Sequence, residues 1–182
     1  MKKIGIWVLA LFMINATGCV KDIEQFDYDA QMELEKPIIA EYVEENIPNA
    51  IYDSRSSIWY EILEEGDPNS YDYRLDVSGH VISPLVTVNY TGKLLSGHVF
   101  DSNDNPDGID FDLGALILAW HIAFLPKQVD EREAIGLTEM GLKKGSKIRF
   151  VTPSFYGYRD QQHGSIPPNS PLDFTIKVLD IR

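Results

Sequence analysis

Several stretches of the chain alternate apolar and polar residues, which is typical of strands with one face in a core. The stretch VTVNYT at residues 86–91 is the clearest, because Val86, Val88 and Tyr90 alternate with polar side chains. Similar patterns in SIWYEILEE from residue 57, SKIRFVT from residue 146 and PLDFTIKVLDIR at residues 171–182 predict further strands. Turn residues such as GDPNS and SGH separate them. The alternation therefore predicts a sheet.

Two other stretches repeat their apolar residues at helical spacing. Residues 30–47, AQMELEKPIIAEYVEENI, predict a helix that Pro37 can start or kink and that Pro48 ends. This helical extension, placed over residues 30–56, is either a packing helix or a self-association helix. The stretch IDFDLGALILAWHIAF at residues 109–124 predicts a short helix after Gly114. Strands around one helix indicate an α+β domain over residues 57–182.

The first nineteen residues, MKKIGIWVLALFMINATGC, have the layout of an export signal. Two lysines precede an apolar stretch that is too short for a stable spanning helix, and small residues lead to Cys19. The end of this segment resembles the lipobox of bacterial lipoproteins, which implies a signal peptide over residues 1–18 and lipidation of Cys19. Residues 19–29 are then a polar tether. The alternative is an ordinary cysteine behind a soluble secretory signal.

Composition excludes some classes of partner. The chain has 28 acidic and 16 basic residues and a net charge of −12, which argues against nucleic acid and against electrostatic docking on anionic lipid. The four histidines, at positions 80, 98, 121 and 163, lack the spacing of a metal site. The acidic stretch at residues 101–112 lacks the glycine and the final glutamate of a calcium loop. We therefore expect neither a metal nor a cofactor.

Four motifs occur in order along the chain: YTGKLLSGHVFDS, FDLGALILAW, KKGSKIRFVTPSFYGY and GSIPPNSPLDFTIKVL. Together they resemble the FKBP-type peptidyl-prolyl cis–trans isomerases over about residues 57–182. The resemblance implies a strongly curved antiparallel sheet wrapped around a short helix, with a ligand pocket between helix and sheet. It also implies isomerisation of X-Pro bonds without a covalent step.

The resemblance also implies roles for individual residues. Asp101, Tyr158 and Tyr90 are the expected catalytic residues, with Asp101 orienting the pocket through a hydrogen bond to Tyr90. The expected substrate-binding residues are Phe100, Phe111, Leu116, Ile117, Trp120, Ile166 and Phe174. Taken singly, each aromatic residue is equally well explained as core, and Asp101 as the start of a turn. Tyr156 is the alternative to Tyr158 as the tyrosine of the pocket.

Two features depart from the family's pattern. Residues 121–135 include a segment that short family members lack, and it either covers the pocket or lengthens the helix. Arg159 stands where the family usually has glycine, and a positive φ costs arginine more than glycine.

The sequence as a whole predicts a bacterial isomerase that is lipid-anchored in the cell envelope, on the periplasmic face or the cell surface. Its expected partners are unfolded or proline-containing proteins, with a proline-mimicking macrolide as inhibitor. The alternatives are a non-catalytic FKBP-like chaperone or binding module and a structural lipoprotein.

Overall fold

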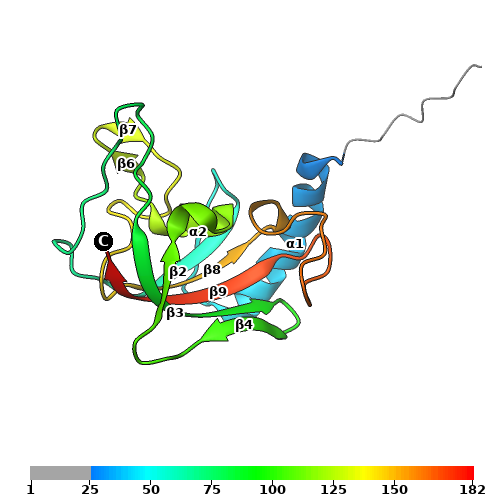
Figure 1. Ribbon diagram of the computed structural model, residues 1–182. Helices are drawn as coiled ribbons and strands as arrows, with labels where there is room; N and C mark the ends of the chain where they lie inside the picture. Colours follow the sequence, from blue (N-terminus) through cyan, green and yellow to red (C-terminus); the bar gives the residue numbers. More distant parts are fainter. Residues whose placement is uncertain (1–25) are drawn as a thin grey trace, which may run out of the picture.

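An antiparallel sheet forms the body of the protein, which a computed structural model describes over residues 26–182 (Figure 1). Within this range the sheet has seven strands: six follow the order β1-β2-β8-β9-β3-β4, and the seventh, β5, pairs with β3. The strands are β1 (Ile51–Asp53), β2 (Ile58–Glu64), β3 (Leu85–Leu94), β4 (Val99–Asn103), β5 (Ile109–Asp112), β8 (Lys147–Thr152) and β9 (Leu172–Ile181). A separate hairpin joins β6 (Gln128–Val129) to β7 (Arg132–Glu133).

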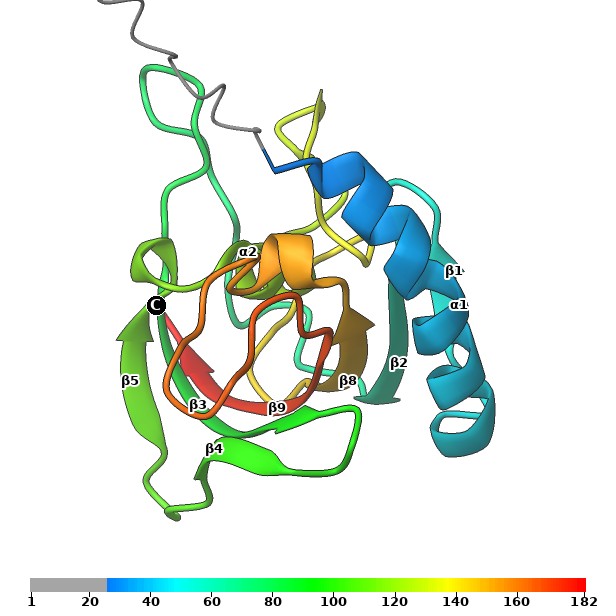
Figure 2. The same ribbon diagram turned by 90° about the vertical axis from the view of Figure 1, so that its right-hand side faces the viewer.

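The alternation along the strands separates two cores on the two faces of the sheet. In β8, Phe150 belongs to the main core beneath helix α2 (Leu118–Phe124), whereas the next residue, Val151, belongs to a smaller core. In β2, Tyr60 belongs to the main core and Trp59 packs against the smaller one. Successive side chains of a strand point to opposite faces, which explains both pairs. Figure 2 shows the sheet curving around α2, with helix α1 (Tyr28–Asn46) outside it. The predicted α+β fold is confirmed.

Helix α2 is short and almost wholly buried. Five of its residues, including Trp120 and Phe124, are less than 5% exposed. A 3-10 turn, η1 (Leu113–Ala115), precedes the helix. The Asp112 carboxylate caps this turn by accepting from the Gly114 N–H. The helix therefore begins four residues after Gly114 and ends at Phe124. The residues that follow form the β6–β7 hairpin, so the segment 121–135 does not lengthen the helix beyond Phe124.

Helix α1 packs against the outer face of the sheet. Its buried stripe, Ile39 and Val43, continues with Ile47 and contacts Val151. The helix runs through Pro37, and Asp27 caps its start by accepting from the Ala30 N–H at 3.0 Å. Helix α1 is therefore a packing helix, which is one of the two alternatives that the sequence left open.

The boundaries of the extension differ from the sequence-based ranges. Helix α1 begins at Tyr28, inside the range expected for the tether. Strand β1, inside the range expected for the extension, pairs with β2 and so belongs to the sheet. The expected signal peptide and Cys19 lie outside the described residues. No helix within residues 26–182 is long and apolar enough to cross a membrane.

Candidate active site

A cavity of about 290 Å³ opens between α2 and the sheet. Its lining side chains come from strands β3, β4, β5 and β9, from η1 and α2, and from loops, so the cavity exists only in the folded domain. Its lining residues are Tyr90, Phe100, Asp101, Phe111, Ala115, Leu116, Ile117, Trp120, Tyr158, His163 and Phe174. We call it the aromatic cavity. All the predicted site residues except Ile166 and the undescribed Cys19 line it.

Trp120 is the central aromatic residue of this cavity. It is 4% exposed, and its ring makes edge-to-face contacts with Tyr90, Phe111 and Phe174 at centroid distances of 5.4, 6.0 and 5.9 Å. Its other neighbour, Phe124, stacks on it at 6.0 Å. Such contacts on several sides fix the indole plane. The tryptophan therefore presents a rigid apolar surface suited to a small ring.

The glycine of the YTG motif makes room for the aromatic wall. A Cβ atom on Gly92 would lie 2.6 Å from the Phe100 ring and 2.9 Å from the Phe174 ring. Both distances are shorter than van der Waals contact, so any larger residue at position 92 would displace the two rings. Phe100 and Phe174 in turn pack edge-to-face at 5.7 Å.

The polar side of the cavity begins with a hydrogen bond between two neighbouring strands. The Tyr90 hydroxyl on β3 donates to Asp101 Oδ2 on β4 at 2.7 Å, as the sequence predicts. Burial, and then the bond to Asp101, raise the pKa of Tyr90, so its hydroxyl stays protonated and donating. Asp101 lies inside β4, at the exposed rim of the cavity, rather than in a turn.

Tyr158 and His163 also line the aromatic cavity. Their rings stack at 4.1 Å with an interplanar angle of 7°. Burial raises the pKa of Tyr158, and the negative charge of Asp101 adds to the shift. Unlike that of Tyr90, the Tyr158 hydroxyl has no hydrogen-bond partner among residues 26–182. The Tyr158 hydroxyl is thus a protonated donor at the mouth of an apolar cavity.

Ile166 is the one described residue of the predicted site that does not line the aromatic cavity. Its side chain is 3% exposed and belongs to the main core. Its backbone N–H and C=O pair with those of His163, and this bridge turns the loop so that His163 reaches the cavity instead. Sequence reasoning missed His163 because it considered the histidines only as metal ligands. It also missed Ala115, whose small side chain carries no recognisable chemistry.

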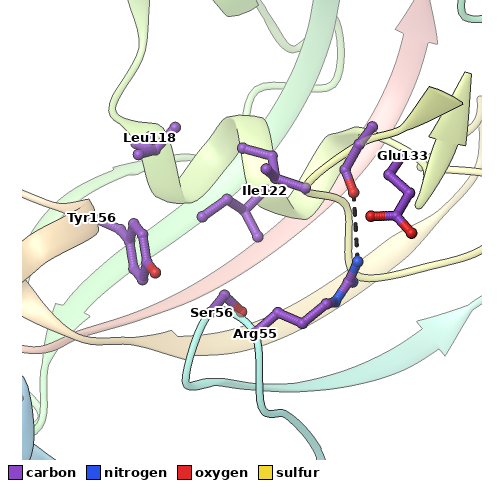
Figure 3. Close-up of a pocket in the computed structure, with 8 residues that line it drawn as sticks. Arg55, Ser56, Leu118, Ile122, Glu133 and Tyr156 are labelled. Atoms are coloured by element: carbon purple, nitrogen blue, oxygen red, sulfur yellow. Dashed lines mark hydrogen bonds between the residues drawn. The ribbon is translucent and has the colours of Figure 1, made fainter.

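A second cavity, of about 370 Å³, contains the alternative tyrosine (Figure 3). It is lined by Arg55, Ser56, Leu118, Ile122, Glu133, Ala134, Ile135 and Tyr156. Figure 3 shows Tyr156 and Leu118 on one side of this space, and Arg55 opposite, donating to a backbone oxygen, that of Ala134, at 3.5 Å. Tyr156 and Tyr158 therefore line different cavities.

The inserted segment also belongs to the second cavity. Ile122 and residues 133–135 line it, whereas no residue from 121 to 135 lines the aromatic cavity. Within residues 26–182, no group of three or more metal-ligating side chains is close enough to hold a metal ion.

Comparisons with known proteins agree with this geometry. The family model described as FKBP-type peptidyl-prolyl cis-trans isomerase matches residues 81–179. A probable FKBP-type peptidyl-prolyl cis-trans isomerase of Haemophilus influenzae is 41% identical over 98 residues, which make up 53% of this chain and 34% of that protein. The probable isomerase FkpA of Neisseria meningitidis is 29% identical over 167 residues, 88% of this chain and 51% of that protein. The chain thus spans about a third to a half of the length of these relatives.

Solved structures show the same fold. A peptidyl-prolyl cis-trans isomerase from Pseudomonas syringae superposes with a TM-score of 0.56 at 22% identity, covering 86% of this chain and 97% of that one. FkpA from Escherichia coli superposes with a TM-score of 0.55 at 25% identity, covering 85% of this chain and 64% of that one. Because the family model matches more than half of its residues, this chain belongs to the FKBP-type peptidyl-prolyl cis–trans isomerase family.

Proposed function

We propose that this protein is a peptidyl-prolyl cis–trans isomerase that acts on X-Pro bonds of exported proteins in the aromatic cavity. The observation that carries the proposal is the protonated Tyr158 hydroxyl, which no group within residues 26–182 hydrogen-bonds and which lines a cavity built around Trp120. Its substrates are unfolded or proline-containing proteins, and a proline-mimicking macrolide occupies the same cavity as an inhibitor.

The barrier to rotation about an X-Pro bond arises from amide resonance and amounts to ~18–20 kcal/mol. The planar amide carries charge on its oxygen, and twisting the bond removes part of that charge separation. An apolar cavity that excludes water therefore favours the twisted amide over the planar one. No covalent bond forms or breaks in this reaction.

Each polar side chain has a separate task in this mechanism. The proline ring packs on Trp120, and the Tyr158 hydroxyl donates to the peptide carbonyl next to the proline. Asp101 holds Tyr90 in place and sets a negative charge at the rim beside the rotating carbonyl.

The two tyrosines provide a matched test. Tyr158→Phe should lower kcat/KM for a proline-containing peptide by about 5- to 150-fold, the equivalent of losing one hydrogen bond worth ~1–3 kcal/mol. Tyr156→Phe removes the same atom two residues away, in the second cavity, and should leave kcat/KM unchanged. A protease-free isomerisation assay on the intact protein measures both. The mechanism is wrong if Tyr156→Phe is the damaging variant or if neither matters.

The two departures from the family's pattern do not favour a non-catalytic protein. The inserted segment leaves the aromatic cavity open. Arg159 adopts the left-handed φ of 57° where the family usually has glycine, and neighbouring groups hold it there. Its N–H donates to the Ser154 carbonyl at 2.9 Å, and its own carbonyl accepts from the Asn169 N–H at 2.7 Å.

We further propose that Cys19 carries a lipid that anchors the protein in the cell envelope. The export-signal pattern of residues 1–18 and the lipobox-like residues before Cys19 support this. Mass spectrometry of the mature protein should show cleavage before Cys19 and the added mass of the lipid. Cys19→Ser should move the protein to the soluble fraction, because the acidic chain has little affinity for anionic lipid. An unmodified thiol in the mature protein contradicts the anchor.

A further inference from the structure

Helix α1 contains a buried carboxylate that the proposed mechanism does not use. Glu35 is 2% exposed, although most other acidic residues of this helix face solvent. Its Oε2 accepts from the Ser154 N–H at 2.8 Å, and its Oε1 accepts from the Ser154 hydroxyl and from Gln31 Nε2. A buried carboxylate is costly unless such donors satisfy it, so this site is built around its hydrogen bonds.

The partner of Glu35 begins the segment that carries Tyr158. Ser154 is the first residue of the 3-10 turn η2 (Ser154–Tyr156). Its carbonyl accepts from the N–H groups of Gly157 and Arg159, both at 2.9 Å, which flank Tyr158 in the chain. Glu35 binds the N–H and the hydroxyl of the same residue. A shift of Ser154 is therefore transmitted through two backbone hydrogen bonds to both neighbours of Tyr158.

A second contact joins α1 to the end of this segment. The Arg159 guanidinium lies over the rings of Tyr28 and Phe155, at 5.4 and 5.2 Å from the ring centroids. Tyr28 and Phe155 themselves pack edge-to-face at 5.5 Å. The first turn of α1 thus stabilises the left-handed conformation of Arg159, the residue that directly follows Tyr158.

We propose that α1 is a positioning element for the aromatic cavity, in which Glu35 fixes Ser154 and thereby the orientation of Tyr158. The proposal rests on the isomerase function proposed above. Glu35 touches no substrate and acts only through the segment 154–159. The N-terminal extension then contributes to the activity of the domain.

Hydrogen exchange of the intact protein tests the structural link without any activity measurement. Glu35→Ala removes the acceptor of the Ser154 N–H, so the amides of Ser154, Gly157 and Arg159 should exchange at least about tenfold faster. Glu41→Ala, the same change on the exposed side of α1, should leave them unchanged. Glu35→Gln keeps one acceptor for the Ser154 N–H and should restore most of the protection. Unchanged exchange in Glu35→Ala overturns the proposal.

A milder variant keeps the test decisive if Glu35→Ala fails to fold. Ser154→Ala removes only the hydroxyl that donates to Glu35 and leaves the backbone bond. It should speed exchange of the Gly157 and Arg159 amides by about two- to fivefold. If both amides keep full protection in Ser154→Ala, Glu35 does not control this segment.

A double-mutant cycle separates positioning from general stability. Glu35→Ala should lower kcat/KM by about 5- to 20-fold in the wild-type background, but by less than about twofold in Tyr158→Phe, because its effect passes through the lost hydroxyl. Equal losses in both backgrounds overturn the proposal. If the wild-type protein shows no isomerisation, the proposed function fails, and the exchange experiment still decides whether Glu35 orders the segment.

Discussion

Replacing Trp120 with alanine should abolish saturable binding of a proline-mimicking macrolide and lower the free energy of unfolding by about 3–5 kcal/mol. The side chain is 4% exposed and contacts four aromatic rings, so its removal leaves a large void beside Tyr90, Phe124 and Phe174. The surrounding rings belong to different strands and to α2, and they cannot all move inward to fill it. Denaturant unfolding and ligand titration measure the two losses separately.

Trp120→Leu is the more informative partner of this variant. Leucine keeps an apolar side chain in the cavity but loses stacking area, so ligand binding should weaken by about 1–3 kcal/mol while much of the stability remains.

Tryptophan fluorescence provides a direct readout of ligand binding at Trp120. Trp59 lies on the other face of the sheet, against α1, and a Trp59→Phe background leaves Trp120 as the reporter in the described range.

In that background the macrolide should change Trp120 fluorescence saturably and block isomerisation over the same concentration range. Trp59→Phe by itself should leave ligand affinity unchanged, because Trp59 is part of the smaller core. A Trp120 signal that ignores the ligand, in a protein that still isomerises X-Pro bonds, would place the active site elsewhere.

Asp173→Ala should destabilise the protein by about 3 kcal/mol, the second-largest effect we expect. Asp173 is 1% exposed and binds groups from three other elements. Its carboxylate accepts from Arg149 of β8 at 2.8 Å and from the Tyr42 hydroxyl of α1 at 2.7 Å, and Lys93 of β3 lies 3.4 Å away. Burial and the bond to Asp173 raise the pKa of Tyr42 to about 12, so its hydroxyl remains a donor. Removing the carboxylate leaves two cations and this hydroxyl without their shared partner.

Asp180→Ala is the matched control on the same strand. Asp180 pairs with Lys144 at 3.0 Å and with Arg182 at 3.5 Å, but all three side chains are 40% exposed or more. Exposed pairs contribute little, so this variant should cost less than about 1 kcal/mol. Urea unfolding of the two variants makes the comparison. Equal destabilisation would mean that the buried network around Asp173 does not hold α1 to the sheet.

Local pattern and motif order determined most of the fold and much of the candidate site. Alternation placed β2, β3, β8 and β9, because the two-residue period of a strand with one buried face is visible in any single stretch. Helical spacing placed α1 and α2 to within a few residues. The four ordered motifs predicted which side chains meet, including the bond between Tyr90 and Asp101, which the structure confirms.

Only the tertiary structure decided what depends on a partner far away in the chain. Glu35 reads as one more surface glutamate of α1, yet it is buried against Ser154, 119 residues later. The same holds for Ile166 and His163, whose short bridge decides which of the two side chains reaches the cavity, and for Tyr156 and Tyr158, which line different cavities. Periodicity shows which face of an element is apolar, but not which other element covers that face. Hydrogen bonds between distant residues leave no period in the sequence, because any chain segment that brings a donor to the right place will satisfy the acceptor.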